Sequence, residues 1–185
     1  MKKILYFAAL LFCVGLTSCE ENNVFFGEKE DIGGTATEAT AGDWYVTVDA
    51  ADESGNVIPG FEDLFGLGRI HMITNNTAAN LPTEMVVSDL GNFWEFKVKV
   101  NCDQNALTFQ TNTSENNNLW AGYEDINVTI SGGKILPKAG RQKNGSPADS
   151  IVFYVSFSDD AYPAAYGYKN YRVSGIRYSG LEEND

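Results

Sequence analysis

From Gly42 onward, apolar residues alternate with polar ones in short segments, and this alternation constrains the fold more than any other feature. Trp44, Val46 and Val48, for example, are each separated by one residue. A period of two puts one face of a β-strand in the core, whereas a helix needs a period near 3.6. After a first strand that begins at Gly42, strands are expected over residues 69–75, 83–89, 93–102, 105–111, 123–131, 150–157 and 168–178. Eight antiparallel strands joined by short turns suit a closed barrel or a sandwich. The sequence therefore predicts an all-β domain.

The number of strands depends on residues 130–136, where Gly132 and Gly133 interrupt an apolar run. The glycines either kink one strand or form the turn of a hairpin. A kink gives eight strands, whereas a hairpin gives nine and moves every later loop to the opposite end. We favour the kink, and with it a single antiparallel up-and-down β-barrel.

The last expected strand places an arginine on the inward face. Tyr171, Val173, Gly175 and Arg177 share one face by period two. In an eight-stranded barrel the last strand runs antiparallel to the first, so that Arg177 lies near Trp44. A guanidinium stacked on an indole contributes roughly 0.5–2 kcal/mol. We predict that Trp44 and Arg177 form a structural clasp that closes one end of the barrel.

The first 18 residues have the pattern of an export signal. Lys2 and Lys3 precede an apolar run over residues 4–16, which is too short to span a membrane as a helix. The run ends in a small residue followed by Cys19, which resembles the bacterial lipobox. There the cysteine becomes the acylated first residue of the mature chain, modified with fatty acids such as palmitate. Residues 1–18 are therefore expected to be a lipoprotein signal peptide, and the protein to be anchored to the outer membrane of a bacterial envelope, facing the periplasm or the exterior.

The remaining chain divides into a lipidated flexible tether, residues 19–41, and a barrel domain, residues 42–185. None of the 25 Asp and Glu lies in the signal, whereas two of the 13 Lys and Arg do, so residues 19–185 carry a formal charge of −14. Such a surface repels nucleic acid and anionic head groups, and the lipid anchor is the expected membrane contact. With Cys13 removed in the signal and Cys19 acylated, Cys102 has no partner for an intrachain disulfide, and period two makes it a small hydrophobe on an inner strand face.

Two resemblances accompany this pattern. Gly42-Asp43-Trp44 on the first strand, with Arg177 on the last, resembles the signature of the lipocalin-like (calycin) barrels. More specifically, the segments AGDWYVTVDA, NTAANLPTEMVVSDLGNFWEFKVKVN and ADSIVFYVSFSDDAYPAAYGYKNYRVSGIRYSG are similar to a family of bacterial lipoproteins named "lipid-binding putative hydrolase". The resemblance covers roughly Gly42 to Gly180. It implies a lipocalin-like barrel at the cell envelope that binds an apolar molecule. Residues 52–67 are longer than the first loop usual in the family.

A barrel of this kind has an open mouth at the end where the first strand finishes. The first loop then brings apolar residues to that mouth, with Phe61, Leu64 and Phe65 spaced as one helical turn. Eight strands either fill with side chains or hold one small ligand, so these residues line a pocket or plug the barrel. The residues expected to bind a lipid or fatty-acid-like ligand, at the mouth and on the walls, are Phe61, Leu64, Phe65, Trp94, Phe96, Val98, Phe109, Trp120, Phe153, Tyr162 and Tyr166.

The sequence offers little for catalysis. His71 is the single histidine, it lies mid-strand, and no Gly-x-Ser-x-Gly motif occurs. No catalytic residue, cofactor or metal ligand set is therefore predicted, and Asp159-Asp160 is expected to be a solvated turn. An alternative function is a surface module that recognises a glycan or a protein through exposed aromatics such as Tyr45, Trp120 and Tyr154. A third, a lipid hydrolase, rests on the family name.

Overall fold

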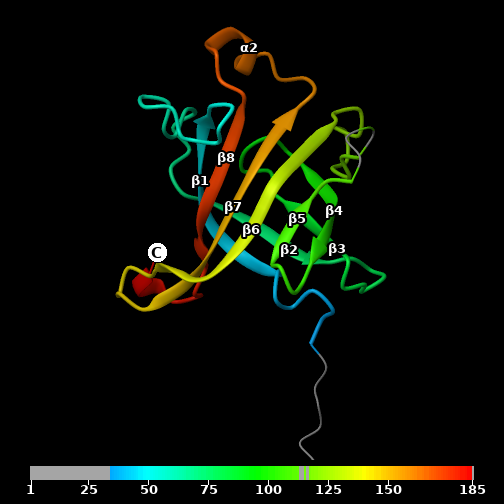
Figure 1. The fold of residues 1–185 in the computed structure, drawn as a ribbon, viewed down its shortest axis with the longest axis vertical. Coiled ribbons are helices and arrows are strands. Elements are labelled where there is room, and N and C mark those ends of the chain that lie inside the picture. Colours follow the sequence, from blue (N-terminus) through cyan, green and yellow to red (C-terminus); the bar gives the residue numbers. More distant parts are fainter. Residues whose placement is uncertain (1–33, 113–114, 116, 185) are drawn as a thin grey trace, which may run out of the picture. The chain divides into compact units, whose positions relative to one another are not determined.

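The computed structural model describes residues 34–112, 115 and 117–184, and the predicted signal peptide and Cys19 lie outside them. Eight strands form one closed antiparallel barrel in which each strand pairs with the next and β8 pairs with β1 (Figure 1). Their bounds are β1 Gly42–Ala51, β2 Ile70–Asn76, β3 Glu84–Ser88, β4 Lys97–Asp103, β5 Thr108–Gln110, β6 Val128–Arg141, β7 Pro147–Phe157 and β8 Asn170–Arg177. The prediction of a lipocalin-like up-and-down barrel of eight strands is confirmed.

The inner face of the barrel follows the period of two. In β1, Trp44, Val46, Val48 and Ala50 are buried, while the residues between them are half-buried on the outer face. β8 closes the barrel in antiparallel register with β1, pairing Trp44 with Arg177. The apolar alternation of the sequence therefore becomes one continuous core inside the barrel.

The glycines at 132–133 kink one strand, as predicted. β6 runs from Val128 to Arg141 and pairs with β7 on both sides of the glycines, with register shifts between Ser131 and Lys134 and between Leu136 and Gly140. Gly132 has a φ of 60°, which a side chain rarely adopts, and a Cβ on Gly133 would collide with the ring of Phe109. The kink thus needs a residue without a side chain at both positions.

The predicted start of the fourth strand is wrong. The strand expected from Phe93 begins at Lys97, and residues 93–96 form a loop instead. The buried carboxylate of Asp89 accepts hydrogen bonds from the backbone N–H groups of this loop, so those groups are not free to pair with a neighbouring strand. Trp94 consequently lies on a loop, not on a strand face. The strand expected from Tyr123 likewise begins later, at Val128.

Two short helices complete the described part. α2 covers Tyr162–Tyr166 in the loop before β8, and the 3₁₀-helix η1 covers Glu182–Asn184. Among the described residues, no helix has the length and apolar character needed to cross a membrane.

The two ends of the barrel differ in what covers them. We call the end with the 52–69 and 158–169 loops the open end; it also carries the 89–96 and 111–127 loops, and α2 stands above it in Figure 1. The opposite end, here the closed end, is covered by residues 34–41, which form turns that bury Thr37 and Thr40 completely. The packed part of the chain therefore begins before β1, at the closed end.

Candidate ligand-binding site

A cluster of aromatic side chains fills the open end. Phe65, on the first loop, lies with its ring centroid 5.6–6.1 Å from those of Phe93, Trp94 and Tyr171. Phe157 joins them from the end of β7 and stacks on Trp94 at 4.9 Å with nearly parallel planes. We call Phe65, Phe93, Trp94, Phe157 and Tyr171 the ring cluster. In this cluster a side chain of the first loop packs against rings of the 89–96 loop and of β8.

The first loop is held above the barrel by an aspartate in a left-handed backbone conformation. Asp63 has a φ of 45°, and its carboxylate accepts hydrogen bonds from the N–H groups of Leu67 (2.8 Å) and Gly68 (3.0 and 3.1 Å). Its own N–H donates to Asp49 at the end of β1 (2.9 Å). This tight turn directs apolar residues onto the core, and those that pack there, partly buried, are Phe61, Leu64, Phe65 and Leu67.

The 89–96 loop is organised around one buried carboxylate. Oδ1 of Asp89 accepts hydrogen bonds from the N–H groups of Gly91 and Phe96, and Oδ2 accepts from those of Phe93, Trp94 and Glu95, over 2.7–3.0 Å. Asp89 is fully buried. Sequence reasoning missed this role, although an aspartate at the end of a strand before Leu-Gly-Asn is a turn signal. Asp89 therefore fixes the backbone that carries two members of the ring cluster.

A chain of hydroxyl groups ties the loop before β8 to the ring cluster. Tyr171 donates a hydrogen bond to the carboxylate of Asp160 (2.6 Å), and its hydroxyl also lies 2.8 Å from that of Tyr168. The pKa of Tyr171 is raised far above its ordinary value, mainly by burial and next by the hydrogen bond to Asp160. The turn at Asp159-Asp160, predicted to be solvated, is therefore solvated only in part. Asp159 is exposed, whereas Asp160 is half-buried and bonded to Tyr171.

The predicted wall residues lie inside the barrel. No part of Phe96, Val98 or Phe153 is exposed (0 % each), and Phe109 is exposed by 3 %. Side chains therefore fill the space around these residues in this structure. A ligand at the open end would have to displace the first loop rather than enter an existing void.

The predicted rim residues divide into two groups. Tyr162 reaches the ring cluster, 5.6 Å from Phe65, and stacks on Tyr166, which is 58 % exposed. Trp120 lies on the 111–127 loop and approaches Gly91. Of the aromatics proposed for surface recognition, Tyr154 donates its hydroxyl to the carbonyl of Gly55 (3.0 Å) and packs on the outside of the barrel.

Two of the depressions on the surface of the described part include residues predicted to bind the ligand. One, of about 340 Å³, opens beside the ring cluster and includes Phe93, Trp94 and Tyr123 in its lining. The other, of about 450 Å³, lies along β4, β5 and the kink of β6, and includes Cys102 and Phe109. The second is larger but shares only Phe109 with the predicted ligand-binding residues. The Cys102 side chain is half-buried against the core there, and its burial raises the pKa of the thiol.

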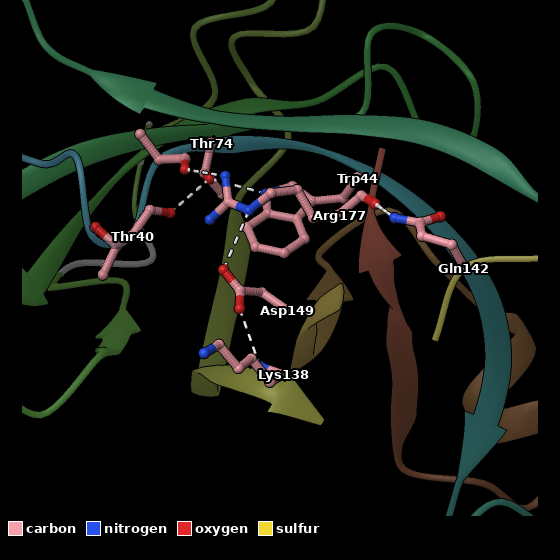
Figure 2. Close-up of polar contacts among 8 residues, drawn as sticks. Thr40, Trp44, Thr74, Lys138, Gln142, Asp149 and Arg177 are labelled. Carbon is pink, nitrogen blue, oxygen red and sulfur yellow. Dashed lines mark hydrogen bonds and ion pairs between the residues drawn. The ribbon is translucent and has the colours of Figure 1, made fainter. Parts of the chain in front are cut away.

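Figure 2 shows how Arg177 closes the other end. Its guanidinium lies 4.5 Å from the centroid of the Trp44 ring, donates to the carbonyl of Ala41 (2.8 Å) and pairs with Asp149 (3.3 Å). The indole N–H of Trp44 donates to the hydroxyl of Thr74 (2.9 Å). A Cβ on Gly42 would collide with the guanidinium, which gives the glycine of the Gly-x-Trp triplet a steric reason.

His71 lies on the outer face of β2, on the opposite side of the sheet from the ring cluster. Its Nδ1 is 3.0 Å from a carboxylate oxygen of Asp43, and its ring contacts the edges of Tyr45 and Tyr178. Within the described ranges, no three His, Cys, Asp or Glu side chains gather as a metal site.

The closed barrel and its ring-filled open end define a class, the lipocalin-like barrels. Within that class the chain belongs to the family described as lipid-binding putative hydrolase, whose model matches residues 29–182. No curated protein matches the chain. Family membership and the barrel both fit the binding of a lipid.

Proposed function

We propose that this protein is a lipid-anchored protein of the bacterial envelope that binds a lipid or fatty-acid-like molecule at the open end of its barrel without hydrolysing it. The observation that carries the proposal is the position of Phe65. This side chain of the first loop is half-buried and packs against three of the other four rings, while Phe157 and Tyr171 belong to strands of the barrel. Loops open at lower free-energy cost than strands, so Phe65 is the part of the core that an apolar ligand can replace.

The energetics favour a long acyl chain. Displacing Phe61, Leu64, Phe65 and Leu67, four of the five partly buried apolar side chains of the first loop, costs roughly 4 kcal/mol, taking about half of the full burial energy of each. A bound chain of about 14 carbons contributes roughly 11 kcal/mol, at about 0.8 kcal/mol per buried CH₂. Association itself costs at least about 4 kcal/mol. Chains of about six carbons, worth roughly 5 kcal/mol, therefore do not displace the loop, whereas chains of about 14 carbons do.

The anchor and the absence of catalysis rest on separate observations. Lys2, Lys3, the apolar run and Cys19 support lipidation and an outer-membrane location. His71 supports a binding role, because a hydrolytic base must reach the bound ligand and this histidine lies on the outer face of β2, paired with Asp43. The ring cluster supplies apolar contact and no base.

Native mass spectrometry of the mature protein extracted from its own membranes tests the binding proposal. We expect a co-purifying lipid and uptake of a fluorescent long-chain fatty acid. Phe157→Asp should weaken that uptake at least tenfold, because Phe157 stays in the ring cluster when Phe65 is displaced and the aspartate would put a charge against the bound chain. Leu81→Asp is the matched control, since Leu81 is exposed in the turn before β3 at the closed end. A ligand-free mass together with no uptake would refute the proposal.

A further inference from the structure

The depression beside the ring cluster combines aromatic surface with negative charge. Its lining includes three aromatic residues, Phe93, Trp94 and Tyr123, and two acidic ones, Glu95 and Asp159, around a volume of about 340 Å³. The remaining lining residues are Gly91, Asn92 and Ile126, so no lysine or arginine contributes. Aromatic faces and carboxylates together attract an ammonium group, because the ring quadrupole and the full charges act in the same direction.

The backbone holds Glu95 in a conformation that an ordinary side chain avoids. Its φ is 54°, in the left-handed region where glycine or asparagine is usual. Two contacts impose it: Asp89 accepts the N–H of Glu95 (2.9 Å), and Asn118 donates to its carbonyl (3.3 Å). Strain of this kind is retained where the surrounding structure over-determines it, often at a binding site.

The two carboxylates are each joined to an aromatic residue of the lining. Asp159 accepts a hydrogen bond from the indole N–H of Trp94 (3.1 Å). The hydrogen bond to Glu95, and then its negative charge, raise the pKa of Tyr123. Each contact uses only one of the several lone pairs of a carboxylate. Both carboxylates can therefore still accept a further hydrogen bond or pair with a cation.

Phe93 and Trp94 belong both to this depression and to the ring cluster. Phe65, which the acyl chain would displace, is 5.7 Å from Phe93 and 6.1 Å from Trp94, measured between ring centroids. A chain lying in place of Phe65 would therefore bring its head group to the rim of the depression. A cationic head group fits there, whereas an anionic one meets two carboxylates.

We infer that the depression lined by Phe93, Trp94, Tyr123, Glu95 and Asp159 binds an alkylammonium group, supplied by the head group of the lipid whose chain lies at the open end. That the ammonium group belongs to a bound lipid rests on the proposed function. Free amines carry the same ammonium group, so a lipid head group and a free amine must be tested separately. The strongly acidic chain also raises the local concentration of a cation over an anion.

Calorimetric titration of the mature protein with three amphiphiles of one chain length, below their micelle concentrations, tests it. We expect tetradecyltrimethylammonium to bind at least tenfold more tightly than tetradecanol, and tetradecanoate to bind most weakly. Glu95→Gln should remove most of the preference for the cation, and added salt should reduce it. The control Glu53→Gln removes the same charge from an exposed position of the first loop, outside this depression, and should leave the preference unchanged.

The outcomes separate the inference from the proposed function. Equal binding of all three amphiphiles, unaffected by Glu95→Gln, would overturn the ammonium site and leave lipid binding in place. Binding of free tetramethylammonium in a Glu95-dependent way, with no binding of any long-chain probe, would keep the cation site and overturn the lipid head group as its source. If neither the amphiphiles nor tetramethylammonium bind, both are refuted.

Discussion

Replacing Asp89 by asparagine should destabilise the barrel far more than the same change at an exposed turn. Asparagine keeps one of the two side-chain oxygens, and its NH₂ group replaces the other. That NH₂ group then faces the backbone N–H groups that the replaced oxygen accepted from. The less costly orientation puts the amide where Oδ1 lies, leaving the N–H groups of Gly91 and Phe96 without an acceptor. Phe96 is buried whereas Gly91 is exposed, and an unsatisfied buried donor costs about 1–3 kcal/mol, so Asp89→Asn should lower the free energy of unfolding by roughly 1–3 kcal/mol.

Asp103→Asn is the control, because the Asp103 carboxylate also accepts two backbone N–H groups, those of Asn105 and Ala106, but at an exposed turn. Both N–H groups donate to Oδ1, which asparagine keeps, and water solvates the exposed amide group, so the expected change is below about 1 kcal/mol. Urea unfolding followed by tryptophan fluorescence measures both variants. Hydrogen exchange should also accelerate at the Gly91 and Phe96 amides in Asp89→Asn. Equal midpoints for the two variants would show that the buried carboxylate does not organise this loop.

Two further changes test the closed end and the ring cluster. Arg177→Ala should lower the free energy of unfolding by roughly 2–3 kcal/mol, because it removes the stack on Trp44 and the hydrogen bond to the carbonyl of Ala41, and Arg177→Lys should recover less than half of this in urea unfolding. Burial and the bond to Asp160 raise the pKa of Tyr171 in the folded state, so its contribution to stability is complete below the unfolded pKa of about 10 and is lost as the pH rises above it. The chain should therefore unfold more readily above about pH 10, and Tyr171→Phe should reduce the slope of stability against pH in that range; an unchanged slope would contradict this.

The closure of the barrel was predictable because it depends on local alternation and on the number of strands. Once the glycines at 132–133 were assigned to a kink, the parity of eight strands placed Arg177 beside Trp44. The 93–96 loop was not predictable by the same means, because its aromatic residues have high β propensity and alternate like a strand. The five hydrogen bonds to Asp89 override that propensity.

The candidate site was predictable in its residue types more than in its contacts. That the first loop carries apolar residues to the open end follows from the direction of β1. That Phe65 meets Tyr171 depends on the turn at Asp63, whose left-handed backbone no residue pattern signals. The depression with Glu95 was missed for a related reason, because its lining comes from three loops that only the folded barrel brings together.

The two ends of the barrel are held by different kinds of interaction, and this difference bears on where a ligand can enter. At the closed end, Arg177 and Trp44 are fixed by directional hydrogen bonds to Ala41 and Thr74, which an apolar molecule cannot replace (Figure 2). At the open end, Phe65 is held by contacts between rings, which are non-directional and which an alkyl chain can supply equally well. Exchange of protein contacts for ligand contacts is therefore least costly at the open end, on the first loop.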